Sequence, residues 1–343
     1  MTNHREFDYS NRTLYSIESD AVRYTWAGYC LFVITSSFLG DTTILVASIK
    51  HRAFKLHRTI IVNIQHIAFC DLMVAAMDVF PRFVSTIANG WILGRFLCYL
   101  TAYGRYYFNT ASVLLLCSLT SSKLLLLKYP LRFRVVKAKT AHYFCAACWL
   151  VSLTFPVTFL LVDRRDIYSS FRDYQCIFAA TLEVWQWVKP IFAIFFLFIP
   201  TCLVVAGTIW LLVIARRFAR RGRESMKWQG TIAIVLTAAV YCISILPIFM
   251  YHIGAALLDV DDESNTFFFI NFYRVAISFM SLNTISNFYI YSLTVHSFRR
   301  FVLSRILRSP RLSYISSVGT STSSGQGKRA DILGIFFFCK VWI

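Results

Sequence analysis

The chain has 343 residues, of which 57% are hydrophobic, 17% aromatic and only 15% charged. Soluble domains of this size carry about a quarter charged residues, so the composition excludes an ordinary soluble fold and predicts a membrane protein. The formal net charge of +18 would suit a nucleic-acid-binding protein, but the way the basic residues are distributed argues against that class.

Seven windows of the sequence are long and apolar enough to span a membrane. They lie near residues 24–49, 59–86, 96–127, 140–162, 186–216, 229–258 and 266–294. Each exceeds the roughly 17 residues that a spanning helix needs, and windows of this length satisfy their backbone in lipid as helices. No Gly-, Ser- or Pro-rich linker separates them. The sequence therefore predicts one all-α membrane bundle of seven helices.

Lys and Arg are concentrated in four alternate segments between these windows, near residues 50–58, 128–139 and 216–227 and from Arg299 onward. Because cytoplasmic loops of membrane proteins are rich in Lys and Arg, these segments are expected inside the cell. An odd number of spans then puts the N-terminus outside, where the glycosylation sequon at Asn11 could receive a glycan. We interpret the basic segments as topology signals and contacts with lipid head groups, with no nucleic acid bound.

The third window carries a cysteine at its outer end and a cation at its inner end. A helix from Cys98 to Lys123 would span about 37 Å, enough to cross a hydrocarbon core of about 30 Å. Between Arg105 and Lys123 there is no charged residue. Cys176 also falls on the outer, oxidising side, so a bridge between Cys98 and Cys176 would pin the second outer loop to the top of this helix.

Several short motifs, in their order and spacing, resemble those of the rhodopsin-like (class A) G-protein-coupled receptors. The segments that carry the resemblance are Leu39-Gly40-Asp41, Ile67-Ala68-Phe69-Cys70-Asp71, Trp91-Ile92-Leu93-Gly94 before Cys98, Trp149, Pro200, Pro247 and the segment 282–291, which ends Asn287-Phe288-Tyr289-Ile290-Tyr291. Within the family, Asn89-Gly90-Trp91 and Gln175-Cys176-Ile177-Phe178 look somewhat like melatonin-type receptors. The resemblance implies a multi-pass protein of the plasma membrane.

The resemblance also implies how the chain is divided. We expect an extracellular tail at residues 1–23, the seven-helix bundle at 24–294, a short amphipathic eighth helix on the inner leaflet at 295–308, and a cytoplasmic tail at 309–343. The tail is rich in Ser and Thr, a composition that predicts disorder. Receptor kinases, and arrestin after them, are therefore expected partners.

Three departures from the family's pattern bear on signalling. The Asp-Arg-Tyr motif of the third helix is Ser122-Lys123-Leu124 here, so a point charge replaces the guanidinium fork and the acid that would clamp it is missing. Ile245 replaces the tryptophan of the sixth helix, and Phe288 replaces the proline of the seventh, together with the kink that a proline would cause.

Asp71 lies in the middle of the second window, where an ionisable side chain costs at least about 2.5 kcal/mol and indicates a functional site. The resemblance implies that Ser112, Asn283 and Asn287 surround it, and such oxygen-bearing side chains would suit Na⁺. The alternative is a polar cluster that holds the helices together by hydrogen bonds. Asp41 would stand near Asp71, and because two close carboxylates rarely both ionise, one of them would carry a proton. A Na⁺ site, with no other cofactor, and a plain polar cluster both stay open.

By the resemblance, a ligand cavity opens outward between the third, fifth, sixth and seventh helices. Arg105 lies about 10 Å below Cys98 along its helix, at the depth of such a cavity. An unpaired arginine there would favour a carboxylate or phosphate ligand through bidentate hydrogen bonds. The alternative is an internal ion pair with Asp78, because a buried charge needs a partner. The other residues expected to line the cavity are Tyr106, Asn109, Phe249, His252 and Arg274.

The function that the resemblance implies is a cell-surface G-protein-coupled receptor. It would transmit the signal of an extracellular small molecule or peptide to a heterotrimeric G protein, through a state in which the sixth helix moves about Pro247. The face that contacts the G protein would carry Lys123, Tyr291, Arg216, Arg217 and Arg220.

Other functions remain to be weighed against this one. An enzyme is not expected, because the sequence has no metal-spaced His/Cys set, phosphate loop, or nucleophile with a recognisable base. The first alternative is a decoy or constitutively active bundle without a ligand switch, which the Ser122-Lys123-Leu124 segment would suit. The second is a transporter or channel, against which no repeat relates the two halves of the span pattern.

Overall fold

The computed structural model describes residues 20–49, 54, 56–134, 136–154, 156–158, 191, 194–219, 225–257 and 263–307. Every regular element in these ranges is a helix, so the predicted all-α class is confirmed. The chain divides into two compact units, residues 1–299 and residues 300–343. All the sites described below lie in the first unit.

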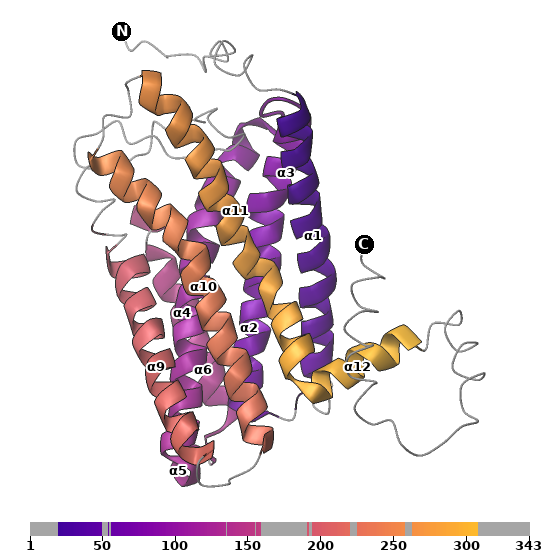
Figure 1. Ribbon diagram of the computed structural model, residues 1–343, viewed down its shortest axis with the longest axis vertical. Coiled ribbons are helices and arrows are strands. Elements are labelled where there is room, and N and C mark those ends of the chain that lie inside the picture. The colour runs from indigo at the N-terminus through magenta and orange to yellow at the C-terminus, as the bar shows by residue number, and fades with distance from the viewer. Residues whose placement is uncertain are drawn as a thin grey trace. The chain divides into compact units, whose positions relative to one another are not determined.

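Seven long helical segments build the first unit in the described part of the chain. They are α1 (Asp20–Ile49), α2 (Arg58–Val74) continued by η3 (Ala75–Val79) and α3 (Phe80–Ile87), α4 (Gly94–Lys128), α6 (Ala138–Ser152), η4 (Ile194–Phe198) continued by α9 (Ile199–Ala219), α10 (Ser225–Leu257) and α11 (Glu263–Thr294). The short helix α5 (Pro130–Arg134) follows α4, and α12 (His296–Leu307) follows α11. Figure 1 shows the long segments lying side by side.

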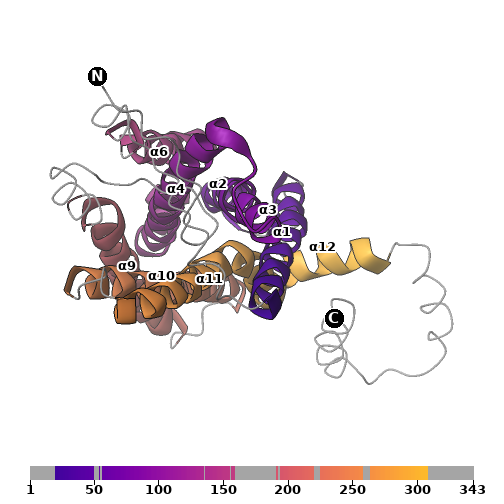
Figure 2. The same cartoon turned by 90° about the horizontal axis from the view of Figure 1, so that it is seen from above.

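The long segments close into a ring, which is best seen from above (Figure 2). Going round it, α1 packs against α2, α2 against α4, α4 against α9, α9 against α10, α10 against α11, and α11 against α1. The remaining helix, α6, packs on α2 and α4. The ring brings the first and last membrane segments of the chain into contact.

Most of the predicted windows agree with the helices to within a few residues. In the described part of the chain, six helices are long and apolar enough to cross a membrane, and α11, with 32 residues, completes the bundle. The windows near 140–162 and 186–216 are described only in part. The first helix begins at Asp20, before the expected residue 24, and this acidic residue in its first turn suits the positive end of the helix dipole.

A π-helical turn interrupts the second segment. In η3 the hydrogen bonds reach one residue further than in an α-helix, and the N–H of Phe80 donates to the carbonyl of Ala75. Pro81 follows in the first turn of α3, where its missing N–H costs little. Such turns are frequent at functional sites because they re-aim the side chains that follow. Here the turn carries Asp78 and precedes Arg82.

The helices α1 and α11 approach closely at Gly40. A Cβ atom at Gly40 would lie 2.8 Å from the Cβ of Phe288, so only glycine fits there. Phe288 stands where the family pattern has proline, and α11 runs as a single α-helix from Glu263 to Thr294. The Phe288 ring packs edge-on against Phe298, with ring centroids 6.1 Å apart.

Candidate functional site

Asp78 accepts hydrogen bonds from two arginines through the same carboxylate oxygen. Arg105 of α4 donates from Nε to Oδ1 at 2.8 Å, and Arg82 of α3 donates from Nη2 to Oδ1 at 2.7 Å. The Asp78–Arg105 ion pair that the sequence analysis offered as one alternative is therefore present. Arg82 was missed, and the only signal for it in the sequence is an arginine one helical turn after Asp78.

This arginine cluster, made of Asp78, Arg82 and Arg105, is buried. The three side chains are 9%, 1% and 12% exposed, respectively. Its two guanidinium groups share one carboxylate, which leaves one positive charge uncompensated among the three. In addition, Nε and Nη1 of Arg82 have no hydrogen-bond partner in the described structure. A buried donor without a partner costs free energy, so a ligand that accepts hydrogen bonds from these two atoms would stabilise the cluster.

The other residues predicted to line a ligand cavity lie on helices around the arginine cluster. Tyr106 of α4 is close enough to Arg105 to interact with it electrostatically, and so is Tyr273 of α11, which was not predicted. Phe249 of α10 packs edge-on against Phe198 of η4, with ring centroids 6.3 Å apart. Asn109 lies on α4, half-buried.

Two further predicted residues lie on α10 and α11. Arg274 is half-buried on α11, and its carbonyl accepts a hydrogen bond from Ser278. His252 lies on α10, but its side chain is outside what the structure describes. That these residues bind a ligand stays a prediction.

A second buried polar group, here called the polar centre, lies between α1, α2 and α11. Asn287 donates from Nδ2 to Oδ2 of Asp71 at 2.8 Å, and Ser37 donates to Oδ2 of Asp41 at 2.6 Å. Asp41 and Asp71 are near enough to repel each other electrostatically. The structure therefore brings the two carboxylates together, as expected, and joins Asn287 to Asp71. Ser37 was not anticipated, and that these residues form a cation site stays a prediction.

Three side-chain oxygen atoms of the polar centre accept no hydrogen bond in the described structure. Oδ1 of Asp41, of Asp71 and of Asn287 has no hydrogen-bond partner in the described structure, and such oxygens are the ligands that a hard cation prefers. Ser112 is buried and Asn283 half-buried. No set of three or more His, Cys, Asp or Glu side chains within the described ranges has metal-binding geometry. A cation here would therefore depend on amide and hydroxyl oxygens besides the two carboxylates.

At the opposite end of α4, Lys123 is buried, with 3% of its surface exposed. Its Nζ lies 3.4 Å from where a Cβ of Gly230 would be, so α4 and α10 meet closely there. Within the described part of the chain no carboxylate pairs with Lys123. A cation without an acidic partner is what the Ser122-Lys123-Leu124 segment predicted.

Tyr291, the second residue predicted for the inner face, is buried in an aromatic cluster. Its ring packs edge-on against Phe54, at 6.0 Å between centroids, and against Phe298 at 6.4 Å. Phe54 also stacks on Phe298 at 4.8 Å. This cluster ties the connection between α1 and α2 to the end of α11. Tyr291 therefore acts through packing, and it is not an exposed contact residue in this structure.

Three other predicted features are described only in part. Arg216 and Arg217 are exposed in the last turn of α9, whereas Arg220 lies outside the described residues. Cys98 is buried near the start of α4 and is disulfide-bonded. Its expected partner, Cys176, lies outside the described residues, as does Asn11, so the Cys98–Cys176 pairing and the glycan stay predictions.

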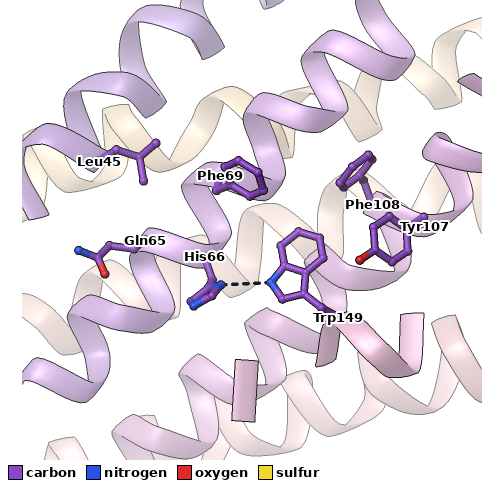
Figure 3. A pocket seen from close by; sticks show the side chains of 7 residues that line it. All are labelled: Leu45, Gln65, His66, Phe69, Tyr107, Phe108 and Trp149. Carbon is purple, nitrogen blue, oxygen red and sulfur yellow. Dashed lines mark hydrogen bonds between the residues drawn. The ribbon is translucent and has the colours of Figure 1, made fainter. Parts of the chain in front are cut away.

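A pocket of about 600 Å³ lies on the side of the bundle where α1, α2, α4 and α6 meet (Figure 3). Aromatic side chains dominate its lining, which consists of Leu45, Gln65, His66, Phe69, Tyr107, Phe108 and Trp149. The ligand cavity was predicted elsewhere, between the third, fifth, sixth and seventh helices. The apolar lining of this pocket suits a hydrocarbon group, such as part of a membrane lipid.

A directed hydrogen-bond chain forms one wall of this pocket. Trp149 donates from Nε1 to Nδ1 of His66 at 3.1 Å (Figure 3), and Nε2 of His66 lies 3.2 Å from Nδ1 of His142. Because Nδ1 of His66 accepts, the ring hydrogen of the neutral imidazole lies on Nε2, which then donates to His142. These hydrogen bonds link α6 to α2, and no sequence motif indicates them.

Most of the chain matches a known protein family. The family described as 7 transmembrane receptor (rhodopsin family) matches residues 40–291. The match begins in α1, at the close contact with Phe288, and ends in α11 at Tyr291. It therefore covers both the arginine cluster and the polar centre.

Curated relatives are more distant. The chain is 27% identical to the octopamine receptor beta-2R of Chilo suppressalis over 43% of this chain and 38% of that one. It is 24% identical to the annetocin receptor of Eisenia fetida, over 56% of this chain and 46% of the relative. With the QRFP-like peptide receptor of Branchiostoma floridae it shares 22% identity, over 65% and 62%. The chain thus covers less than two thirds of the length of each of these relatives. From the family match over most of the bundle, the chain belongs to the rhodopsin family of seven-transmembrane receptors.

Proposed function

We propose that this chain is a cell-surface receptor that passes the signal of an extracellular small molecule or peptide to a heterotrimeric G protein. The observation that carries the proposal is the family match, which spans the bundle from α1 to the end of α11. Relatives named as receptors for octopamine, annetocin and a QRFP-like peptide support it. A mouse relative is named probable G-protein coupled receptor 63, which supports the choice of transducer.

We propose that the bundle lies in the plasma membrane with its N-terminus outside. Arg216 and Arg217 are exposed at the end of α9, and the positive-inside rule supports a cytoplasmic position for this end of the bundle. Asn11 and Cys98 then face the outside, where a glycan and a disulfide bond are both expected. The inner end, with Lys123, is the face on which the G protein would dock.

The ligand of this receptor would bind around Arg105, between α4, α10 and α11. The cluster of Asp78, Arg82 and Arg105 supplies the charge, and Tyr106 and Tyr273 lie beside it. The binding of a ligand shifts the bundle only if the ligand contacts the two states differently. If a ligand group replaced Asp78 as the ion-pair partner of Arg105 in one state only, the ligand would bind the two states with different affinity.

The polar centre is proposed to hold Na⁺. The unpaired oxygens of Asp41, Asp71 and Asn287 support this assignment, and Ser112 and Asn283 are the further residues expected around it. An ion bound there would stabilise the arrangement in which α2 and α11 are joined, by mass action.

One observation favours a second candidate function, a receptor that signals without a ligand. Lys123 is buried, and no carboxylate in the described ranges pairs with it. A resting state that is not held by an ion pair at this end of α4 lies closer in free energy to an active one. The decoy function would differ, because it predicts neither basal nor ligand-dependent signal.

Expression of the full chain in cells separates these functions, with readouts of cAMP, calcium and arrestin recruitment. A response to a member of a panel of small molecules and peptides supports the proposed receptor, whereas basal signal with a silent panel supports the ligand-independent one. The control is Asn11→Gln, which should reach the surface but lose one glycan. A cytosolic Asn11, or no signal of any kind, would contradict the proposal.

A further inference from the structure

The charge of the arginine cluster is not balanced. Arg82 and Arg105 both donate to Oδ1 of Asp78, and each donor nitrogen lies within 2.8 Å of that oxygen. One carboxylate can neutralise only one of the two guanidinium groups. The ion pairs of the described residues bring no second carboxylate to the cluster, since the remaining pair joins Arg23 to Asp20 on α1.

The donors of Arg82 are not satisfied either. A guanidinium group has five N–H donors in a fixed plane, and only Nη2 of Arg82 has a partner, Asp78. Nε and Nη1 have no hydrogen-bond partner in the described structure, and water does not reach them because the side chain is only 1% exposed. A buried guanidinium group with unused N–H donors can bind an anion through charge-assisted hydrogen bonds.

The surroundings of Arg82 strengthen any charge interaction. Arg82 lies near Cys30 and Tyr29. Cys30 belongs to a buried apolar cluster with Val79, against which Phe83 and Tyr29 pack. The Tyr29 hydroxyl donates to the carbonyl of Ser278, and neither Nε nor Nη1 of Arg82 donates to its oxygen. In such an apolar environment an ion pair is worth more than in water, and a charge left over costs more.

We propose that Asp78, Arg82 and Arg105 form a binding site for one monovalent anion, held by Nε and Nη1 of Arg82. One negative charge balances the cluster, whereas a dianion such as sulfate would leave it negative. The anion is either a halide from solution or the carboxylate of the receptor's organic ligand. The carboxylate source rests on the proposed receptor function, and the halide source does not.

The test measures thermal unfolding of the purified full chain in detergent, titrated with chloride or acetate and with sulfate as the balancing dianion. A saturable rise in Tm of about 2 °C or more is expected with a monovalent anion and not with sulfate. A rise with chloride assigns the halide source, and a rise with acetate alone assigns the carboxylate. No rise, or an equal rise with sulfate, overturns the proposal.

Variants tie the effect to this site. Arg82→Gln removes the surplus charge and should abolish the anion-dependent rise, whereas Arg23→Gln, which removes an arginine paired near the start of α1, should keep it. Should Arg82→Gln not fold, Arg82→Lys retains the charge but lacks the planar fork, and about tenfold weaker anion binding is expected. An unchanged anion response in the folded Arg82 variant contradicts the site. Because the assay contains no G protein, failed signalling in cells would contradict the receptor function and leave this result standing.

Discussion

Asn287 of α11 donates a 2.8 Å hydrogen bond to Asp71 of α2 in the interior of the bundle. The two residues are 216 positions apart in the chain, and both are buried. A hydrogen bond to a carboxylate away from water is stronger than one between neutral groups. This single contact therefore links the second membrane segment to the last one and helps to close the ring.

Asn287→Ala is expected to destabilise the receptor by about 1.5–3 kcal/mol, because it leaves a buried carboxylate without its donor. Thermal unfolding of the purified chain should show a Tm lowered by at least about 3 °C. Ser286→Ala is the matched control, since among the described residues the Ser286 hydroxyl bonds to the carbonyl of Asn283 in its own helix. Equal losses in the two variants would show that the Asp71 contact contributes nothing particular.

The proposed Na⁺ site makes a separate prediction. At a fixed chloride concentration, replacing choline with Na⁺ should raise Tm in a saturable way, and Asp71→Asn should abolish the rise. K⁺ is the control ion, because it carries the same charge as Na⁺ in a larger ion. If Na⁺ and K⁺ act alike, or if the Asp71 variant responds like the parent chain, the polar centre is a hydrogen-bonded cluster only.

Gly40→Ala tests the close approach of α1 and α11. The added Cβ would meet the Cβ of Phe288 at 2.8 Å, and since a Cβ atom cannot rotate away, the helices must separate. A loss of about 1–3 kcal/mol in the free energy of unfolding is expected. Gly28→Ala in the same helix is the control, because nothing lies within 4 Å of its Cβ position. That change should be neutral or stabilise by up to about 1 kcal/mol.

Asp78→Asn is expected to be among the most damaging single changes in the chain. It leaves the guanidinium groups of Arg82 and Arg105 buried without a counter-charge, which costs about 3–5 kcal/mol. The variant should accumulate poorly, and its surface amount measured by flow cytometry should fall well below that of the parent. Asp20→Asn removes one partner of Arg23, in a pair whose carboxylate side chain is 79% exposed, so its surface amount should be close to the parent's. Similar surface amounts for the two variants would contradict the role given to Asp78.

Much of this fold could be predicted from the sequence because the pattern is simple. Apolar windows of membrane length predict the helices, the Lys and Arg distribution predicts their direction, and the motif order predicts which helices meet. The Asp78–Arg105 pair could be anticipated as well, since a buried arginine needs an acid and few acids lie within the windows.

The missed features depend on geometry that no local pattern reports. Arg82 reaches Asp78 after the π-helical turn η3, whose presence cannot be inferred from the residues Ala75–Val79 alone. The His66–Trp149 hydrogen bond joins two residues that are 83 positions apart in the chain and share no motif. From the sequence, the replacement of proline by Phe288 indicated only that α11 lacks a kink. The structure shows in addition that Phe288 packs against α1 at Gly40.

Restoring the family motif at the inner end of α4 tests the ligand-independent function. The triple variant Ser122→Asp, Lys123→Arg and Leu124→Tyr places an acid beside a guanidinium fork, and the pair should hold the resting state. Basal cAMP, calcium or arrestin signal is therefore expected to fall at least about tenfold, if the added pair is worth about 1.4 kcal/mol in the resting state. The single change Ser121→Asp is the control, because Ser121 is exposed whereas Ser122 is half-buried beside Lys123. It adds the same charge on the exposed face of α4, away from Lys123, and should leave basal signal unchanged. Equal basal signal in the triple variant and the parent, at matched surface amounts, would show that the missing acid does not set the activity.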